Sequence, residues 1–433
     1  MTDIGRWMDG LQERAAEVLP EDVYAYFRRG TGRGMSVAEA TSAWDQFRFR
    51  ARLLRDVSTC DASTTVLGTP VRTPVLVAPS TLQRKAHPDG EAATARGVAA
   101  AGSLLAVTSN TAVPFADLVP SGAPWWVQVY VARDPVLTIE TLERALAAGA
   151  RAVVLTADTP PVNGSRGQRG TQVDDFIGPE DLYGNVTGIP SPEAAERAPD
   201  LTLDVIGWLR ERARGLPIVV KGVLRGDDAR ELVAAGASGL IVSNHGGRQL
   251  DGLVPTAWAL PEVVDAVAGT GAEVYADGGL RRGTHILAAL ALGARAVFIG
   301  RPVLWALTVR GAAGVTRLID DLTDELVEAM SLTGTPSVLE LTRDLLWAAP
   351  RPPLDLSNMR AVDRTCGPSA IELSRNTQCD LLCHRHVTDS PAGEPRKPMT
   401  RSEATSVGER PAPEPLRGIS CTSSVSAESR RPW

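Results

Sequence analysis

Eight short apolar runs, each followed by a helical pattern, constrain the fold of this chain more than any other feature of its sequence. From about residue 74 the runs are PVLVAPS, SLLAVTSN, WWVQVYV, RAVVLTADT, LPIVVKGV, SGLIVSNHGG, EVYADGG and RAVFIGRP. Their continuous apolar character is typical of strands that are buried on both faces in a parallel sheet. Segments between them, such as LTIETLERALAAGA and GDDARELVAAGA, have the spacing of amphipathic helices and end near glycine.

This alternation predicts an α/β fold, a (β/α)8 TIM barrel over residues 74–363. A doubly wound open sheet is the alternative, but no GxGxxG motif follows the first run. Residues 1–73 are expected to form an N-terminal helical segment that packs on the barrel. A Gly- and Pro-rich insertion at about 157–200 is expected to be a lid loop. The composition of residues 364–433, rich in Ser, Pro, Thr and Arg, predicts a disordered tail.

Composition excludes several classes of partner. The net charge of −6 and the scattered basic residues argue against nucleic acid. We expect no membrane span, because no apolar stretch approaches eighteen residues. The start lacks an apolar secretory region and Cys60 is the only cysteine before the tail, so we expect a cytoplasmic protein. The tail segment CDLLCHRH has a spacing that could bind zinc, but no second ligand cluster follows, and we expect no metal site.

Polar residues follow the apolar runs at the point where each strand should end. The carboxyl ends of all eight strands share one mouth in a barrel, and catalytic groups normally lie there. Lys221 ends the run IVVK, where it is either a lysine that reaches solvent at the rim or a cation beside a group that becomes negative. Around the last two strands, Arg281 and Arg301 with neighbouring glycines suit a phosphate, although surface arginines at tight turns would look the same.

The segment SNHGGRQLDG places His245 and Arg248 directly after an apolar run. Its two glycines are poor packing partners for an imidazole, which argues against a histidine that only fills the core. Asp158, two strands earlier, could orient His245 and stabilise its protonated form. Arg248 could bind a substrate carboxylate. The segment is therefore predicted to be part of an active site.

Together these motifs resemble those of the FMN-dependent α-hydroxy acid oxidases and dehydrogenases, a family that includes glycolate oxidase, lactate oxidase, mandelate dehydrogenase and hydroxymandelate oxidase. The resemblance runs from about residue 19 to about 345. It depends most on SNHGGRQLDG, with support from AHPDGEAATARGVAAAG, VQVYV, TADTP, VVKGV, ADGGLRRGTHILAALALGA and FIGRP.

The resemblance implies a role for each matching residue. His245 would be the base that takes a proton as the α-carbon is oxidised, and Asp158 would stabilise the imidazolium. Arg248 and Tyr26 would bind the substrate carboxylate, and Tyr130 would lie near the substrate hydroxyl. The residues implied to bind FMN are Pro79, Ser80, Thr81, Thr108, Gln128, Thr156, Lys221, Ser243, Asp277, Gly278, Gly279, Arg281, Gly300 and Arg301. Among them, Lys221 would stabilise negative charge on the ring and the last four would hold the phosphate end.

Two positions depart from the family pattern. The family carries a second carboxylate-binding arginine after the fourth-strand DTP, but Ser165 stands at that spacing here. Arg166 or Arg169 could replace it, and we prefer Arg166. Asn110 occupies a position where relatives have an aromatic or small apolar residue, which indicates a polar or enlarged substrate pocket or a side chain that faces a loop.

The resemblance predicts oxidation of a 2-hydroxy acid to the 2-oxo acid, with O2 as electron acceptor and H2O2 as product. The alternatives are a quinone or protein acceptor, oxidative decarboxylation, and an FMN barrel without net oxidation. Hydride transfer and carbanion formation both remain open. The resemblance also implies a homo-oligomer, either a tetramer or an octamer.

Overall fold

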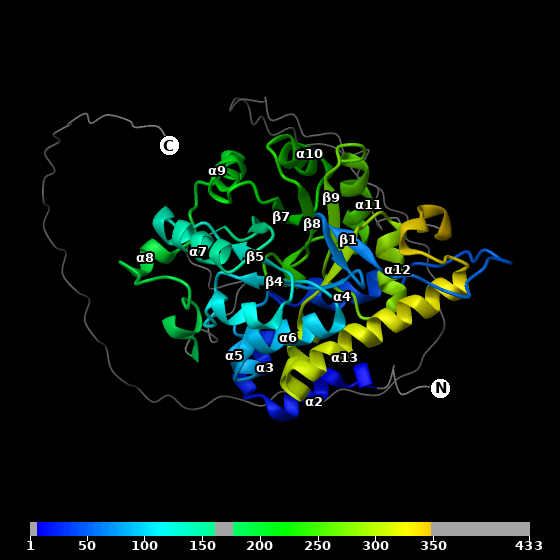
Figure 1. The fold of residues 1–433 in the computed structure, drawn as a ribbon, viewed down its shortest axis with the longest axis horizontal. Helices are drawn as coiled ribbons and strands as arrows, with labels where there is room; N and C mark the ends of the chain where they lie inside the picture. Colours follow the sequence, from blue (N-terminus) through cyan, green and yellow to red (C-terminus); the bar gives the residue numbers. More distant parts are fainter. Residues whose placement is uncertain (1–6, 161–175, 348–433) are drawn as a thin grey trace, which may run out of the picture. The chain divides into compact units, whose positions relative to one another are not determined.

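A closed barrel of eight parallel strands forms the centre of the molecule (Figure 1). The computed structural model describes residues 7–160 and 176–347. The strands follow one another around the barrel in chain order, and β10 closes it against β3. They are β3 (Val75–Val77), β4 (Leu105–Thr108), β5 (Trp125–Val129), β6 (Val153–Thr156), β7 (Ile218–Val223), β8 (Gly239–Val242), β9 (Glu273–Ala276) and β10 (Ala296–Ile299). Each predicted apolar run contains one of them, which confirms the TIM barrel.

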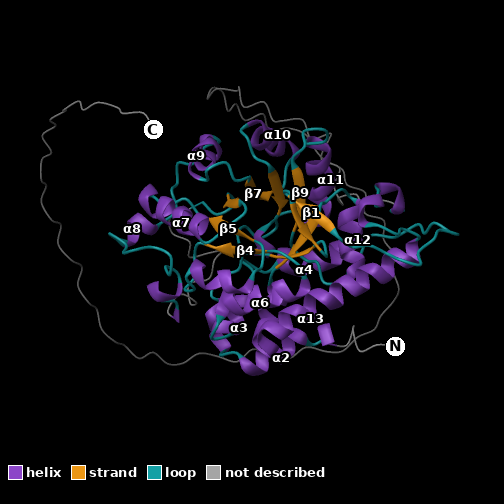
Figure 2. Cartoon of the chain, in the orientation of Figure 1, coloured by secondary structure: helices purple, strands orange, loops and turns teal. Residues whose placement is uncertain are grey.

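Helices surround these strands (Figure 2). On the barrel they are α5 (Gln83–Ala86), α6 (Gly90–Ala101), α7 (Pro135–Ala147), α8 (Pro192–Ala195), α9 (Asp204–Arg212), α10 (Gly226–Ala234), α11 (Thr256–Ala266), α12 (Gly283–Ala291) and α13 (Arg301–Thr333). The backbone of α13 leaves helical geometry at Arg310 and Gly311. The helix that follows the last strand therefore runs on to Thr333 as one kinked element.

The N-terminal segment contributes α2 (Leu11–Val18), α3 (Glu21–Arg28) and α4 (Met35–Trp44), followed by a hairpin of β1 (Thr64–Val66) and β2 (Thr69–Val71). Helices α2 and α3 pack beside α13 (Figure 1). Helix α4 is fixed to the loop after β9, because Trp44 Nε1 donates to Gly278 O at 2.8 Å and Thr41 Oγ1 to Gly279 O at 3.0 Å. The N-terminal helices thus reach the barrel mouth.

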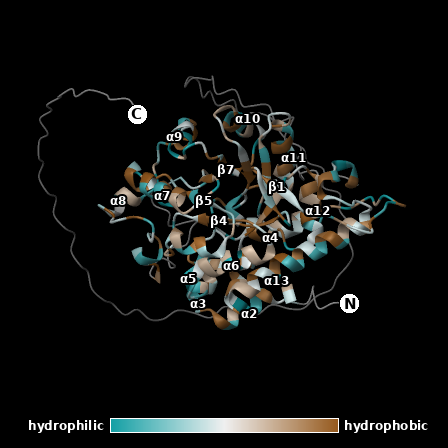
Figure 3. Ribbon diagram, in the orientation of Figure 1, coloured by the Kyte–Doolittle hydropathy of each residue, from teal (hydrophilic) through white to brown (hydrophobic). Residues whose placement is uncertain are grey.

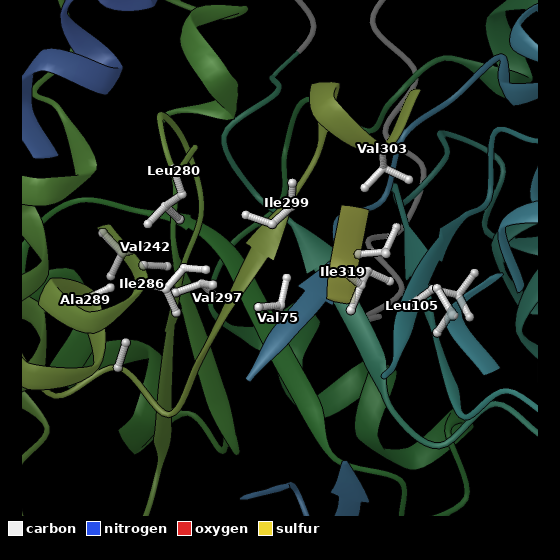
Figure 4. Close-up of a cluster of buried hydrophobic side chains, with 14 of the residues drawn as sticks. Val75, Leu105, Val242, Leu280, Ile286, Ala289, Val297, Ile299, Val303 and Ile319 are labelled. Carbon is white, nitrogen blue, oxygen red and sulfur yellow. The ribbon is translucent and has the colours of Figure 1, made fainter. Parts of the chain in front are cut away.

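The hydrophobic core has two parts, because successive strand residues point to opposite sides of the barrel wall. One set faces the helices; Figure 4 shows Val75, Val242, Val297 and Ile299 with Ile286 and Ala289 of α12. The other set fills the barrel and includes Trp126, Tyr275 and Phe298, whose ring centroids lie 5.5 to 5.8 Å apart. Figure 3 accordingly shows apolar colours along the central strands and polar colours on peripheral helices such as α10.

The same alternation places polar side chains in the barrel mouth. Two residues beyond an interior apolar residue, the strand again points inward but has reached the open end. Interior Trp126 is followed in this way by Gln128, and interior Tyr275 by Asp277. The other such pairs are Ala106 with Thr108, Val154 with Thr156, Val219 with Lys221, and Ile241 with Ser243.

Several predictions fall on parts of the chain that are not described. Arg166, Arg169 and the tail, including its CDLLCHRH segment, lie outside the described residues. The predicted lid loop is described to residue 160 and again from Phe176, where it contains a 3-10 turn (Pro179–Asp181) and α8. Within residues 7–160 and 176–347, no helix combines the length and the apolar character that a bilayer crossing needs.

Candidate active site

A cavity of about 640 Å³ opens at the barrel mouth, beneath α3 and the residues after α8. Most of the predicted site residues line it: Tyr26, Pro79, Ser80, Thr81, Thr108, Asn110, Gln128, Tyr130, Thr156, Lys221, His245, Arg248, Asp277, Gly278, Gly279, Arg281, Gly300 and Arg301. Asp158 and Ser243 do not line the cavity but contact residues that do. The barrel therefore brings the predicted residues of different strands to one place.

Lys221 is buried at the end of β7, with 4% of its surface exposed, so it is not a lysine that reaches solvent at the rim. Its Nζ donates to Ser243 Oγ at 2.8 Å and lies 3.3 Å from Asp277 Oδ2. Burial alone would lower the pKa of Lys221, but Asp277 and Asp158 outweigh it and raise the pKa above the usual 10.5. Lys221 is therefore a fixed cation in the cavity wall.

His245 is held by contacts on both its ring and its backbone. Its Nδ1 donates to Asp158 Oδ1 at 2.9 Å, and its backbone N–H donates to Ser243 Oγ at 3.1 Å. Burial, followed by the charge of Lys221, lowers the pKa of His245 below its usual 6.5, although Asp158 opposes this shift. His245 lowers the pKa of Asp158 in turn, against the effect of burial. At neutral pH the pair is thus a neutral imidazole, with Nε2 left to accept a proton, beside a carboxylate.

Two local backbone features make this arrangement possible. His245 has a φ of +57°, in the left-handed region, and the next two residues, Gly246 and Gly247, continue there at +60° and +75°. A side chain on Gly247 would lie 2.8 Å from Val37 Cγ2. Gly222 has a φ of +111°, and a Cβ there would lie 2.5 Å from Asp158 Cβ. Glycine at 222 therefore leaves the space that the Asp158 carboxylate occupies.

Two tyrosine–arginine pairs stand on the cavity wall. The Arg248 guanidinium lies over the Tyr26 ring, 4.6 Å from its centroid, and Nη1 donates to Tyr26 O at 2.7 Å and to Arg29 O at 3.3 Å. The Arg197 guanidinium lies 4.1 Å from the centroid of Tyr130. Burial raises the pKa of the Tyr130 phenol, which therefore stays protonated at neutral pH. Both pairs present hydrogen-bond donors to an anionic or hydroxylated ligand.

Arg281 and Arg301 bring positive charge to the end of the cavity beside β9 and β10. Burial lowers the pKa of Arg281 to about 10. Burial, with the nearby charges of Arg248 and Arg281, lowers the pKa of Arg301 to about 9. Among the described residues, the guanidinium groups donate only to backbone carbonyls: that of Arg281 to Leu280 O, that of Arg301 to three others. Two neighbouring cations whose side chains donate only to carbonyl oxygens of the described residues form a site for an anion.

Comparison with known proteins identifies the architecture. A family model described as FMN-dependent dehydrogenase matches residues 15–348. The chain belongs to this family. Human (Homo sapiens) 2-hydroxyacid oxidase 1 is 37% identical over 78% of this chain and 95% of its own length, and glycolate oxidase 3 of Arabidopsis thaliana is 40% identical over 76% and 92%. The crystal structure of a mandelate oxidase with (S)-2-phenylpropionate superposes with a TM-score of 0.70 at 36% identity, over 78% of this chain and 97% of that one.

As a member of this family, the protein is an oxidoreductase with FMN as its cofactor, and the cavity fits that group. Gln128 Nε2 is buried at the cavity and has no hydrogen-bond partner among the described residues, and the same is true of Asp277 Oδ1. An amide donor, a carboxylate acceptor and the cation of Lys221 suit the carbonyl and N–H edge of a flavin ring. The unpaired guanidinium groups at the opposite end suit its phosphate.

Some residues of the site were not predicted. Arg197 is part of no recognised motif. It reaches the cavity because its backbone pairs with that of Ala132, which is distant in the sequence. Ile177 and Leu182, from the described part of the insertion, add an apolar wall to the cavity. Gly222 belonged to a recognised motif, VVKGV, but only Asp158, just beyond the neighbouring strand β6, shows why a glycine is needed. Ser243 was predicted to contact FMN, and that stays a prediction, while its hydroxyl contacts Lys221 and His245.

Proposed function

We propose that this protein oxidises a 2-hydroxy acid to the corresponding 2-oxo acid, with His245 as the base and O2 as the electron acceptor. The observation that carries the proposal is the His245–Asp158 pair in the wall of a cavity that also holds Lys221 and Arg248. Relatives named 2-hydroxyacid oxidase, glycolate oxidase and L-lactate oxidase support the substrate class.

Each residue has a part in the proposed reaction. Arg248 binds the substrate carboxylate together with Tyr26, and Tyr130 donates to the substrate hydroxyl. The substrate loses two electrons and two hydrogens from its H–C–O–H group, and Nε2 of His245 receives one proton. Asp158 stabilises the resulting imidazolium, and Lys221 holds positive charge where negative charge develops. FMN, when bound, supplies the two-electron acceptor. O2 finally takes up both electrons and two protons and leaves as H2O2.

The proposal is tested by anaerobic reduction of the holoenzyme. Glycolate, lactate, mandelate and 4-hydroxymandelate are added in turn, and the loss of flavin absorbance is followed. His245→Ala should keep its FMN and be reduced about 10³-fold more slowly, because a positioned base contributes about 10²–10⁴-fold. His87→Ala, which changes a histidine outside the mouth cavity, is the matched control. Reduction of His245→Ala at the wild-type rate would show that His245 is not the base.

The electron acceptor needs a separate measurement. After anaerobic reduction, O2 or a quinone is admitted, and reoxidation, peroxide and the organic product are measured. The proposal predicts fast reoxidation by O2 with one H2O2 and one 2-oxo acid per turnover. Reoxidation by the quinone alone would make the protein a dehydrogenase, and release of CO2 with a shortened acid would indicate oxidative decarboxylation. A holoenzyme that no hydroxy acid reduces would favour an FMN barrel without net oxidation.

We further propose that the protein is a homo-oligomer, a tetramer or an octamer, and that it is cytoplasmic. Support for association comes from exposed apolar side chains, since an apolar surface patch marks an interaction site. Leu54 is fully exposed, and Leu339 and Trp347 are each about two-thirds exposed or more. The segments that carry them are joined by backbone hydrogen bonds from Arg52 N to Thr333 O and from Trp347 N to Arg48 O. Light scattering of the holoenzyme should give a mass of four or eight chains, and a monomer at micromolar concentration would contradict the proposal.

A further inference from the structure

The guanidinium of Arg197 lies in the cavity wall. Its centre is 4.1 Å from the Tyr130 ring centroid, and Nη1 donates to Thr159 O at 3.4 Å. Other arginines of the described chain, such as Arg133 and Arg144, form ion pairs with glutamates at the surface. No acidic side chain of the described residues pairs with Arg197 in this way. Its remaining N–H groups are therefore available to an anion in the cavity.

Backbone pairing fixes the position of Arg197. The segment after α8 runs antiparallel to the residues that continue β5, with Arg197 opposite Ala132. Arg133 N donates to Glu196 O at 2.7 Å, and Ala198 N donates to Val131 O at 2.9 Å. Because side chains alternate along an extended segment, Arg197 is on the same side as Tyr130. The neighbouring Glu196 is on the other side, where its carboxylate accepts from Arg133 Nε at 3.0 Å.

The resulting geometry repeats that of the other arginine in the cavity. Arg248 stacks on Tyr26 and Arg197 stacks on Tyr130, and all four residues line the same cavity. A guanidinium that stacks through its face keeps the N–H groups of its edge for oxygen acceptors. The charge of Arg197 also reaches the Tyr130 phenol, because it lowers the pKa of that group against the effect of burial.

We propose that Arg197 is the second guanidinium that binds the substrate carboxylate, opposite Arg248, and that it selects free 2-hydroxy acids over their esters and amides. The inference rests on the proposed function. It assigns to a residue near the end of the insertion the task that the family resemblance suggested for Arg166.

The test compares Arg197→Leu with Arg133→Leu, a variant of the arginine that pairs at the surface on the same two segments. Steady-state kinetics are measured with the best 2-hydroxy acid and with its methyl ester. Arg197→Leu should raise KM for the acid by about 10–100-fold, since a hydrogen bond to a charged group is worth about 1.5–3 kcal/mol. Its KM for the ester should stay within about twofold. Arg133→Leu should change neither KM value. Arg197→Lys should restore part of the affinity, since the lysine ammonium keeps the positive charge but lacks the planar guanidinium that can form two hydrogen bonds to a carboxylate.

A second readout does not depend on turnover. Titration of the FMN absorbance spectrum with the 2-oxo acid should give a Kd that rises by the same factor in Arg197→Leu, with FMN content and Tm showing that the variant is folded. An Arg197→Leu that matches Arg133→Leu while Arg166→Leu loses the acid would overturn the assignment in favour of Arg166. A wild-type holoenzyme that no hydroxy acid reduces would instead refute the proposed function, whereas a reducible wild type with an unchanged Arg197→Leu would refute only this inference.

Discussion

The two ends of the barrel interior are built on the same strands, yet they differ in every property that matters for chemistry. Trp126 and Gln128 are both on β5 and both point inward. Trp126 packs against Tyr275 and Phe298 in an apolar layer, while Gln128 lies in a cavity with Lys221 and His245. A shift of two residues along a strand thus changes the interior from close-packed to polar.

A hollow by itself does not make a site, as the opposite end of the barrel shows. A hollow of about 550 Å³ lies there, lined by residues that include Glu273 and Arg295. The Glu273 carboxylate already accepts hydrogen bonds from Leu67 N and from the Tyr275 hydroxyl. At the mouth, by contrast, Gln128 Nε2 lacks a partner among the described residues, and there the Arg281 and Arg301 guanidinium groups donate only to backbone carbonyls. The two hollows are similar in volume, so the buried charged groups of the mouth, Lys221 and Asp277, distinguish it better than its size does.

The largest effect is expected at Lys221. Lys221→Met removes the buried lysine cation from the mouth and leaves Asp277 without its ion-pair partner. Anaerobic reduction by substrate should slow about 10²–10³-fold, because a donor that stabilises developing negative charge is worth that much. Arg225→Met, which removes an exposed arginine just beyond the same strand, is the control. Stopped-flow absorbance measures the rate of flavin reduction in both variants. A wild-type rate in Lys221→Met would contradict the claim that the charge of Lys221 is needed for the reaction at the mouth.

A substitution in the apolar layer should lower the stability of the protein and leave the rate of flavin reduction nearly unchanged. Trp126→Leu leaves a cavity between Tyr275 and Phe298 and should lower the free energy of unfolding by about 2–3 kcal/mol, toward the lower end for large-to-small core changes. The folded variant should keep its rate of flavin reduction within a few-fold. Denaturant unfolding and reduction kinetics on one preparation check both parts. A reduction rate that falls as far as in Lys221→Met would show that the two ends are not separable.

A smaller effect is expected at Asp158, which acts through His245. Asp158→Asn keeps the shape of the side chain but removes the charge that stabilises the imidazolium. Reduction should slow about 10–100-fold, less than for loss of the base itself. Because Asp158 raises the pKa of His245, the acid limb of the rate profile should also move to lower pH in this variant. A variant with slower reduction but an unmoved acid limb would contradict direct action on His245.

The smallest effect is the pH dependence of the wild-type enzyme. His245 must be neutral to accept a proton, and its folded-state pKa lies below 6.5. The kcat/KM should therefore rise with pH to a plateau and fall tenfold per pH unit below the pKa of His245, with the acid limb centred below pH 6.5. Measurement of kcat/KM from pH 5 to 8 with one 2-hydroxy acid tests this. An acid limb centred above pH 6.5 would mean that burial and Lys221 do not control the group.

The sequence predicted the barrel and most of the cavity because both depend on short segments. Each apolar run is a strand, and the residue that ends it reaches the mouth by the register of the strand alone, as Lys221 and Gln128 show. What could not be predicted depends on contacts between distant segments. Arg197 enters the cavity through antiparallel pairing with Ala132, and Gly222 is required by Asp158, which lies just beyond the neighbouring strand. Neither relation has a local signature.

The most direct test of the account is a crystal structure of the protein with FMN and a 2-oxo acid bound. The flavin ring should lie at the carboxyl ends of the strands, with Lys221 against the edge of the ring. The FMN phosphate should lie at Arg281 and Arg301. His245 Nε2 should lie within hydrogen-bond distance of the ligand's oxo oxygen, and the Arg248 guanidinium should contact its carboxylate. Flavin bound at the opposite end of the barrel, or His245 turned away from the ligand, would contradict the account.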